Sequence, residues 1–272
     1  MSAEESLRAG NLDQSFQQLQ DQVRSNPSDV KSRIFIFQIM LIQGQWDRAL
    51  NQLNVACEMD DSTLLMAQTY REAIQCEVFR SKVFSGERSP LIFGKPDKWL
   101  ALLIEAIKPI VSEQYKKASK LRNEAFELAP VTTGSINGEP FEWISDADTR
   151  LGPILEIIVN GRYYWVPFHR IKSIIIEEPE DLRDSVWLPA QFTWANAGQA
   201  VGFIPTRYPG SEKAESETIR MAKSTTWQDC GNEIYLGAGQ RMLATENNDY
   251  PLMDIREILL NTEDNELESD DG

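Results

Sequence analysis

The sequence predicts an α+β protein, in which an N-terminal tetratricopeptide-like α-hairpin array precedes a small, mainly antiparallel β-rich domain. Three observations support this fold class: a helical pattern that recurs after 34 residues, a change of periodicity at Pro130, and the two-residue hairpin signal Asn160-Gly161. We expect a helical domain at 1–130, a β-rich domain at 131–260 and an acidic, disordered tail at 261–272.

The helical repeat is clearest in the segments Gly10–Leu19 and Gly44–Leu53. In each segment a glycine turn precedes a large apolar residue, a small residue follows three positions later, and apolar residues then recur at helical spacing. This order is typical of tetratricopeptide-like hairpins, because glycine bends the chain between the helices and the small residue lets them approach closely.

A weaker copy of the pattern begins at Tyr115, with Ala118 as its small residue. Between the copies, Leu64–Phe84 has helical periodicity, the Gly- and Pro-containing segment Ser85–Pro96 interrupts it, and Pro109 ends or kinks the next helix. We therefore expect roughly three to four hairpins stacked in one array. A plain helical bundle that buries the same apolar stripes is the alternative.

After Pro130, short runs of β-branched and aromatic residues replace the helical pattern, which predicts closely spaced strands in a compact sheet or partial barrel. The predicted strands are Phe141–Ile144, Leu155–Val159, Arg162–Pro167, Ile171–Ile176, Val186–Leu188, Gln191–Ala195 and Ala200–Pro205. We expect Ala214–Lys223 to be a helix or a loop, and Tyr250–Leu260 to be a last short helix.

The net charge of −15 is concentrated in the second half, because residues 1–130 carry about −1 and residues 131–272 about −14. Nucleic acids and anionic membrane surfaces both require a cationic binding surface, so neither is expected as a partner. No segment has the length and hydrophobicity of a membrane span or of a secretory signal. The segment Lys95–Arg122 is the exception in charge, with seven basic and three acidic residues.

Cysteine and histidine usage argues against a metal centre and against thiol catalysis. The three cysteines, Cys57, Cys76 and Cys230, are scattered, which suggests reduced thiols and a cytoplasmic location. His169 is the only histidine, whereas metal sites and nucleophilic mechanisms usually need several such residues. We therefore expect no cofactor, no metal and no catalytic residues.

Three segments, GRYYWVPF, DLRDSVWLPA and GFIPTRYPGS, interleave aromatic residues with arginine and proline. Tryptophan is costly to expose and arginine is costly to bury, so such segments build either an aromatic-rich core or a recognition surface. Arginine–carboxylate pairs and arginine–aromatic stacking are expected to fix their loops. The candidate residues for this framework or protein-interaction role are Arg162, Tyr163, Trp165, Arg183, Asp184, Trp187, Arg207 and Tyr208.

These segments, together with AFELAP at Ala125–Pro130 and the pattern GxIxGxxFxWIxDADxRLGPxLE at Gly134–Glu156, resemble the ImpE family. Its members, also called TagJ or SciE-type proteins, are accessory proteins of bacterial type VI secretion systems. The resemblance implies a non-enzymatic adaptor in the bacterial cytoplasm. Such an adaptor contacts the N-terminal helix of the small contractile-sheath subunit, and it assists recycling of the contracted sheath by a hexameric ATPase, directly or indirectly.

Two other functions compete with this interpretation. A hydrolase could use paired carboxylates such as Asp146 and Asp148, although Arg150 favours a local salt bridge there. A helical-repeat scaffold could instead bind an unrelated protein through the cationic face of Lys95–Arg122. The oligomeric state is not predicted from the sequence.

Overall fold

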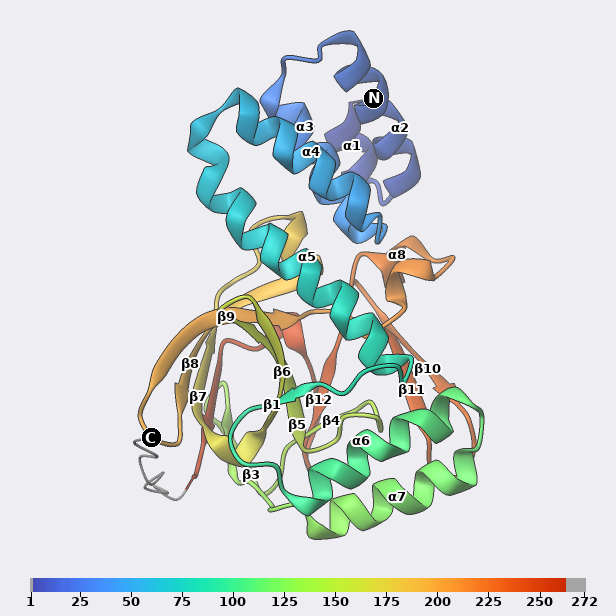
Figure 1. Cartoon of the computed structure of the whole chain (residues 1–272), viewed down its shortest axis with the longest axis vertical. Helices are drawn as coiled ribbons and strands as arrows, with labels where there is room; N and C mark the ends of the chain where they lie inside the picture. The colour runs from blue at the N-terminus through green and yellow to red at the C-terminus, as the bar shows by residue number, and fades with distance from the viewer. Residues whose placement is uncertain (1, 263–272) are drawn as a thin grey trace.

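The computed structural model describes residues 2–262, and it confirms the α+β class. Figure 1 shows the first helices at one end of the molecule, a large sheet at the other end, and the long helix α5 running between them. The described α-helices are α1 (Ala3–Arg8), α2 (Leu12–Ser25), α3 (Val30–Ile42), α4 (Trp46–Met59), α5 (Leu64–Phe84), α6 (Lys98–Val111), α7 (Tyr115–Leu128) and the short α8 (Glu217–Arg220). None of them is both long and apolar enough to cross a membrane.

The repeated pattern does produce helical hairpins. Helices α2, α4 and α7 each begin at the large apolar residue of a copy, and α1–α2, α3–α4 and α6–α7 pack in pairs. The small residues Ser15, Ala49 and Ala118 are all 0% exposed, which shows why the pattern needs a small side chain there. The expected long helix Leu64–Phe84 is present with the same bounds.

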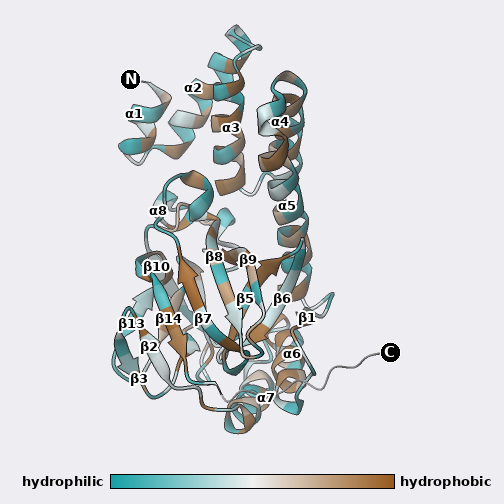
Figure 2. Cartoon of the chain, turned by 90° about the vertical axis from the view of Figure 1, so that its left-hand side faces the viewer, coloured by the Kyte–Doolittle hydropathy of each residue, from teal (hydrophilic) through white to brown (hydrophobic). Residues whose placement is uncertain are grey.

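The hairpins do not form one continuous array. Figures 1 and 2 both place α6–α7 beside the sheet, at the opposite end of the molecule from α1–α4. The segment that follows α5 explains this, because it forms strand β1 (Leu91–Ile92), which pairs with the sheet instead of starting the next stacked helix. Pro109 lies inside α6 and does not end it.

Within residues 2–262, the main sheet contains nine strands in the order β1-β6-β5-β9-β8-β7-β14-β2-β3. All pairs are antiparallel except β1–β6, so the mainly antiparallel character is confirmed. The further strands are β2 (Gly134–Ile136), β3 (Glu139–Phe141), β5 (Ile154–Val159), β6 (Arg162–Pro167), β7 (Ile171–Ile176), β8 (Trp187–Trp194), β9 (Gln199–Pro205) and β14 (Glu257–Leu260). There are two smaller sheets in the described residues. One contains β4 (Ser145–Asp146), β12 (Met242–Ala244) and β13 (Asp249–Pro251). The other contains β10 (Thr225–Asp229) and β11 (Tyr235–Gly239).

The Asn160-Gly161 turn joins β5 to β6 as the sequence predicts. Both turn residues have positive φ, 51° and 67°, which is the conformation that favours Asn-Gly in a two-residue hairpin. Alternation along β5 then divides its side chains between the two faces of the sheet. Ile154 and Ile158 face the core shared with the helices, while Leu155 and Ile157 face a second core.

One expectation for the C-terminal region was wrong. Tyr250–Leu260 is not a helix, because it forms β13, a 3₁₀ turn and β14, and β14 pairs with both β7 and β2. Burial alternates along β14, which is strand periodicity. For Ala214–Lys223, where a helix and a loop were both expected as alternatives, the structure has the short helix α8 at Glu217–Arg220 and no regular helix in the rest. Most of the acidic segment 261–272 lies outside the described residues.

One hydrophobic core extends from the helices into the sheet. It includes Phe37 of α3, Trp99 of α6, Trp165 of β6 and Trp187 of β8. Figure 2 shows hydrophobic residues along α3 and on several strands of the sheet. The division into domains at 1–130 and 131–260 therefore stays a prediction, and the two parts share one interior.

Candidate interaction site

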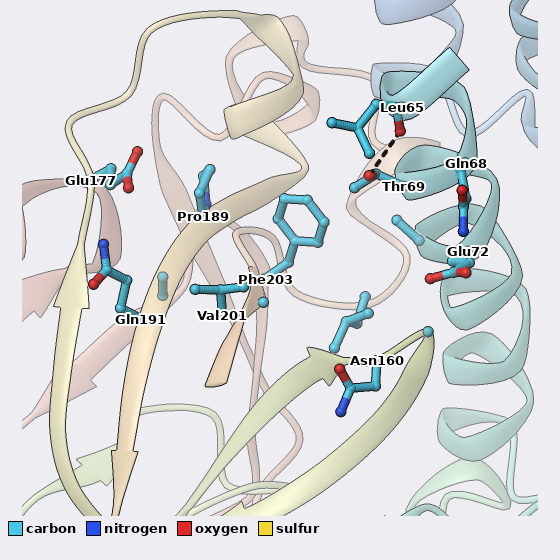
Figure 3. A pocket seen from close by; sticks show the side chains of 15 residues that line it. Leu65, Gln68, Thr69, Glu72, Asn160, Glu177, Pro189, Gln191, Val201 and Phe203 are labelled. Carbon is cyan, nitrogen blue, oxygen red and sulfur yellow. Dashed lines mark hydrogen bonds between the residues drawn. The ribbon is translucent and has the colours of Figure 1, made fainter. Parts of the chain in front are cut away.

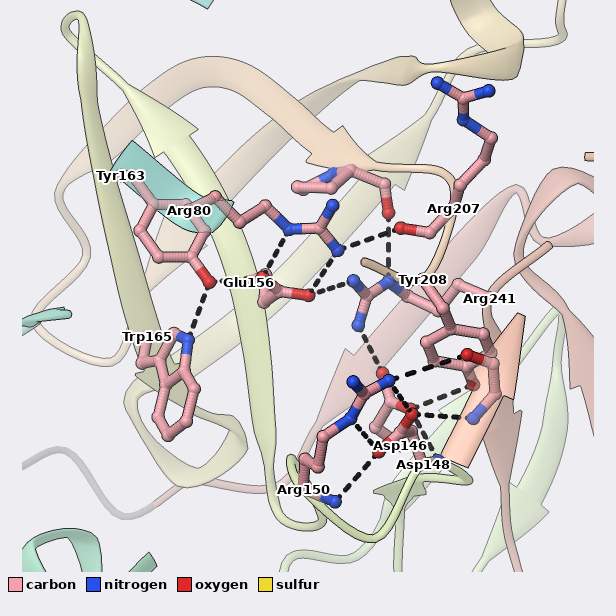
Figure 4. A network of polar contacts seen from close by, with 12 residues as sticks. Arg80, Asp146, Asp148, Arg150, Glu156, Tyr163, Trp165, Arg207, Tyr208 and Arg241 are labelled. Carbon is pink, nitrogen blue, oxygen red and sulfur yellow. Dashed lines mark hydrogen bonds and ion pairs between the residues drawn. The ribbon is translucent and has the colours of Figure 1, made fainter. Parts of the chain in front are cut away.

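A buried network of charged side chains joins α5 to the sheet (Figure 4). Arg80 of α5 donates two hydrogen bonds to Glu156 of β5, Nε to Oε1 at 2.7 Å and Nη2 to Oε2 at 2.9 Å. Arg241 bridges the carboxylates of Glu156 and Asp146. The hydroxyl of Tyr163 also donates to Glu156. The side chains of Arg241, Glu156 and Asp146 are 0% exposed and that of Arg80 is 2% exposed, so these ion pairs are closed to solvent.

The two carboxylates of this network differ in their surroundings. Burial disfavours the ionised form of Glu156, but Arg80 and Arg241 together outweigh it and lower its pKa to about 2. Within residues 2–262, Arg241 is the only ion-pair partner of Asp146, so burial prevails and raises the pKa of Asp146 to about 6. The two pKa values differ because Glu156 pairs with two guanidinium groups and Asp146 with one.

Asp148 belongs to a separate pair with Arg150, as the sequence suggests. The Nε of Arg150 donates to Oδ1 of Asp148 at 2.8 Å, and the backbone N–H of Gly237 donates to Oδ2 at 2.8 Å. Asp146 and Asp148 are therefore both buried and both paired, which leaves neither free to act on a substrate. Within residues 2–262, no group of three or more His, Cys, Asp or Glu residues is placed to hold a metal ion.

Arg207 performs a task that its sequence context did not suggest. Its Nη1 donates to the backbone carbonyl of Ile42 at 2.7 Å and to that of Arg220, which lie at the ends of α3 and α8. Unpaired carbonyls and the negative end of the helix dipole favour a cation at such an end. Burial lowers the pKa of Arg207 to about 10, and the residue is 4% exposed.

Side chains of helix α8 bind the N-terminal end of helix α2. The carboxylate of Glu217 accepts the backbone N–H groups of Leu12 at 2.8 Å and Asp13 at 3.2 Å, at the start of α2. Arg220 forms an ion pair with Asp13 at 3.2 Å. A carboxylate at a helix N-terminus and a guanidinium at a C-terminus both match the dipole, so these contacts fix the first two hairpins against the sheet-rich part.

The DLRDSVWLPA segment packs against the helices. Arg183 pairs with Asp181, with its Nε 2.9 Å from each carboxylate oxygen, and its guanidinium lies 4.8 Å from the ring centre of Tyr70. The expected stacking of an arginine on an aromatic ring is therefore present for Arg183, and the ring belongs to Tyr70 of α5. Asp184 accepts the backbone N–H groups of residues 180 and 181 and so caps the 3₁₀ turn Leu182–Ser185.

Trp187 lies between rings of the helical part. Its ring centre is 5.9 Å from that of Trp46 and 6.1 Å from that of Tyr70, and its indole N–H donates to Glu77. Tyr208 donates its hydroxyl to Asp146 at 3.0 Å, and it joins the same network as Tyr163. The indole N–H of Trp165 donates to the hydroxyl of Tyr163 at 2.7 Å.

The eight candidate residues thus lie mostly at the junction between the helices and the sheet. Of the eight, only Arg162 is exposed, and Arg183 is half-buried. Their contacts fit the framework alternative, which stays a prediction. Sequence reasoning missed Arg80, Glu156 and Arg241, the centre of the network. The sequence signal that could have indicated this network is Glu156 itself, the one carboxylate inside the apolar strand ILEIIV.

One surface cleft lies between α5 and the face of β8 and β9, and it has a volume of about 380 Å³. Figure 3 shows Glu72 on one side of this cleft and Glu177 on the other, with Val201 and Phe203 between them. The described residues that line it are Leu65, Gln68, Thr69, Glu72, Ala73, Ile158, Asn160, Gly161, Glu177, Pro189, Ala190, Gln191, Val201, Gly202 and Phe203. The lining thus combines apolar side chains with the carboxylates of Glu72 and Glu177.

A second depression continues this cleft across the sheet. It shares Asn160, Gln191 and Val201 with the first and extends to Ile175 of β7. Leu65 is 78% exposed, Val201 is 73% exposed and Ile175 is 38% exposed. Three large aliphatic side chains are thus exposed along these two adjoining depressions.

Comparisons with known proteins agree with this architecture. Residues 138–259 match the model of the family described as ImpE protein. The type VI secretion system accessory component TagJ of Pseudomonas aeruginosa is 46% identical over 258 residues, which cover 95% of this chain and 90% of that protein. A crystal structure of a Vibrio parahaemolyticus protein, 24% identical, superposes with a TM-score of 0.88 and covers 96% of this chain and 98% of the other, so it shares the fold.

The family match covers most of the sheet-rich part, and the Pseudomonas relative extends the similarity through the helical part. The matched residues include Glu156, Tyr163, Trp187 and Arg207, which contact α3 or α5 from the sheet-rich part. On the family match and the similarity over almost the whole length, the chain belongs to the ImpE family.

Proposed function

We propose that this protein is a non-enzymatic accessory component of a bacterial type VI secretion system, which binds the small contractile-sheath subunit in the cytoplasm. The observation that carries the proposal is the 46% identity to an accessory component of such a system over 95% of the chain. An identity this high, spread over both the helical and the sheet-rich parts, supports a common task and not merely a common fold.

The chemistry of the described residues supports an adaptor role. The carboxylates that a hydrolase would need, Asp146 and Asp148, are buried and paired with Arg241 and Arg150. His169 lies half-buried beside the ring of Trp99, and burial lowers its pKa. The surface instead offers a concave apolar region, which is the kind of feature that binds a helix of a partner.

The finer part of the proposal concerns the partner. The family resemblance implies that the adaptor contacts the N-terminal helix of the small sheath subunit. It also implies that the adaptor assists the ATPase in recycling contracted sheath, by direct contact or through the sheath. An amphipathic helix bound in an apolar groove would provide such a link without chemistry at the site.

Binding can be measured by isothermal titration calorimetry with the full chain and the small sheath subunit of the same secretion system. We expect binding to the intact subunit and loss of binding when its N-terminal helix is deleted. A subunit that lacks the helix and binds equally well would contradict the proposed contact. The absence of any heat of binding when the intact subunit is titrated at high micromolar concentration would contradict the proposed function.

A second candidate is a scaffold that binds an unrelated acidic protein through the cationic face. Lys116, Lys117 and Lys120 line a shallow depression at the start of α7, together with Tyr115 and Asn232. Reversal of charge at Lys116 and Lys117 tests this surface in a pull-down from a bacterium that carries the secretion system. If every captured protein is retained by the double variant, this face is not the binding site.

A further inference from the structure

We propose that the acidic segment of residues 263–272 binds a lysine cluster on helix α7 of the same chain, formed by Lys116, Lys117 and Lys120. An acidic partner then reaches this cationic face only by displacing the segment. The inference goes beyond the proposed function, because it assigns an occupant to a surface at the start of α7. Three observations lead to it: the lysines lack ion-pair partners, the segment has the opposite charge, and the segment begins within reach.

The lysine cluster has no charged partner in the described part of the chain. Lys116, Lys117 and Lys120 are exposed and line one depression at the start of α7. Glu113 is the one acidic residue among the described residues that line this depression. Within residues 2–262 none of the three lysines forms an ion pair. The depression therefore carries an excess of positive charge that the described residues leave uncompensated.

The segment 263–272 has the complementary charge. It contains six acidic residues and neither lysine nor arginine. Residues 131–262, which precede it, hold 11 basic and 19 acidic residues, so much of the neighbouring surface repels it. The segment Lys95–Arg122, which contains the lysine cluster, has seven basic and three acidic residues and attracts it.

The segment begins close enough to reach the cluster. Thr262, which precedes it, lines a depression together with Leu128, the last residue of α7. From Leu128 to Lys116 the helix spans about 18 Å at 1.5 Å per residue. Ten extended residues reach up to about 33–36 Å, so the segment can follow α7 to its first turn. Figure 1 shows α7 along the outer edge of the molecule, where a segment can lie beside it.

Charges on the second half of α7 direct the segment toward the first half. Glu124 is already paired with Lys98, Nζ to Oε1 at 3.2 Å, and Glu127 is exposed one residue before the end of the helix. Both carboxylates repel an acidic segment, whereas the lysine cluster attracts it. The charge along the exposed side of α7 thus changes sign between the two ends of the helix.

Tethering makes a weak electrostatic contact effective. Exposed ion pairs are individually weak, so a separate acidic peptide binds such a cluster only loosely. A segment of the same chain has an effective concentration in roughly the millimolar range, and this converts loose binding into substantial occupancy. Because the contact lies at the surface, salt screens it, and we expect its occupancy to fall as ionic strength rises.

The first experiment maps the contact by carbodiimide crosslinking, which joins a carboxylate to a lysine without a spacer. The full chain is prepared in nitrogen-14 and nitrogen-15 forms, and the two are mixed before crosslinking and mass spectrometry. We expect the segment 263–272 to be linked to Lys116, Lys117 or Lys120 within single isotopic forms. These links should decrease at about 1 M salt, where the Debye length is about 3 Å.

Two results of the crosslinking would overturn the inference. Lys31 of α3 and Lys213 of the 3₁₀ turn Ser211–Lys213 are exposed lysines away from α7 and serve as internal controls. If the segment is linked to these controls as often as to the cluster, the contact is not specific. If the links to the cluster join only different isotopic forms, the segment acts between two copies of the protein and not within one.

The second experiment measures competition with a fluorescent synthetic peptide of residues 263–272. It compares the wild-type chain with a full-length variant in which the segment is partly neutralised by Glu266→Gln, Glu268→Gln, Asp270→Asn and Asp271→Asn. We expect the neutralised variant to bind the peptide at least about fivefold more tightly by fluorescence anisotropy, because its own segment no longer occupies the cluster. Equal affinities of the two proteins, or no binding by the variant, would contradict the proposal.

Reversal of charge then locates the peptide on α7. Lys116→Glu with Lys117→Glu, introduced into the neutralised variant, should weaken peptide binding at least about tenfold, whereas Lys31→Glu with Lys213→Glu should leave it unchanged. Equal thermal unfolding midpoints show that these variants fold. Binding that survives the reversal on α7 overturns the assignment of the cluster. Neither experiment uses the sheath subunit, so the result does not depend on the proposed function.

Discussion

At the scale of single residues, the least expected feature is the ion-paired cluster around Glu156. Strand alternation places this carboxylate on the face of β5 that packs against α5, where water does not reach it. A buried charge is tolerated only when its partners are also buried and well placed, and Arg80, Arg241 and Tyr163 provide those partners. The cluster therefore fixes how the helix meets the sheet.

Replacement of Glu156 by glutamine should destabilise the fold severely. The variant leaves Arg80 and Arg241 buried without this carboxylate, and breaking such a pair costs about 3–5 kcal/mol. The free energy of unfolding from urea titration measures the loss, with Glu142→Gln as an exposed control that should change stability by less than about 0.5 kcal/mol. A loss below about 1 kcal/mol in E156Q would show that the cluster does not support the junction.

The same residue predicts a response to acid. The pKa of Glu156 is about 2 in the folded protein and 4.5 for an ordinary glutamate, so its stabilising contribution is complete above pH 4.5 and is lost as pH falls toward 2. Burial raises the pKa of Asp146 to about 6, so this residue lowers the free energy of unfolding as pH rises from 3.8 to about 6. Below pH 3.8 Asp146 is protonated in both states and no longer contributes to the slope.

Urea unfolding between pH 2 and 3.8 therefore isolates the contribution of Glu156 from that of Asp146. We expect the free energy of unfolding to decrease with falling pH in this window, with a shallower slope in E156Q. Parallel pH profiles for the two proteins would contradict the assignment of the acid response to Glu156.

At the scale of elements, helix ends connect distant parts of the chain. Glu217 of α8 accepts the first N–H groups of α2, and Arg207 donates to the last carbonyls of α3 and α8. Each charge has the sign that the helix dipole favours at that end. The first two hairpins are therefore attached to the sheet-rich part by polar contacts at their ends as well as by the apolar core.

Substitution of Glu217 by alanine should loosen the start of α2. Loss of a helix N-cap interaction costs about 0.5–2 kcal/mol, and the amides of Leu12 and Asp13 lose their acceptor. Hydrogen exchange followed by mass spectrometry should show faster exchange in a peptide that covers Asn11–Ser15. Glu215→Ala removes a carboxylate nearby and serves as the control, and equal exchange in both variants would exclude the cap.

At the scale of the whole molecule, the helices and the sheet depend on one shared interior. Helix α5 places Phe84 5.9 Å from Trp165 and Tyr70 6.1 Å from Trp187, measured between ring centres. Its Arg80 has its main partner, Glu156, in the sheet. A chain cut after Pro130 would expose both the aromatic rings and this guanidinium to water.

The fragment 1–130 is therefore expected not to fold cooperatively by itself. Circular dichroism should show reduced helicity for the fragment relative to the helical part of the full chain, and its thermal transition should be broad. The full-length protein under the same conditions is the control. A sharp, reversible transition of the fragment alone would establish 1–130 as an independent domain.

Much of the fold was predictable because it depends on local chemistry. Glycine and small residues at a spacing of 34 residues specify helical hairpins, and Asn160-Gly161 specifies a two-residue turn. The helix expected at Tyr250–Leu260 is absent, although the spacing of Leu252 and Ile255 is also compatible with a helix. Pairing on both sides of β14 then decided in favour of a strand.

The candidate site was predicted only in part. The aromatic–arginine segments were found because their composition is unusual, and the Asp148–Arg150 pair was found because its members are two residues apart. Arg80 and Arg241 are 76 and 85 residues from Glu156 along the chain, so no local sequence pattern predicts that they pair with it. The surface cleft likewise combines α5 with β8 and β9, which are distant in sequence.

By itself, the sequence determined the α+β class, the hairpin pattern, the family resemblance and the excess of negative charge in the second half. These properties depend on periodicity, turn chemistry and composition, which act over short stretches of chain. Tertiary structure alone decided which arginine meets which carboxylate, where α6–α7 lies, and which aliphatic side chains remain exposed in a groove. Burial and ion pairing depend on three-dimensional neighbours, and long-range strand pairing brings those neighbours together.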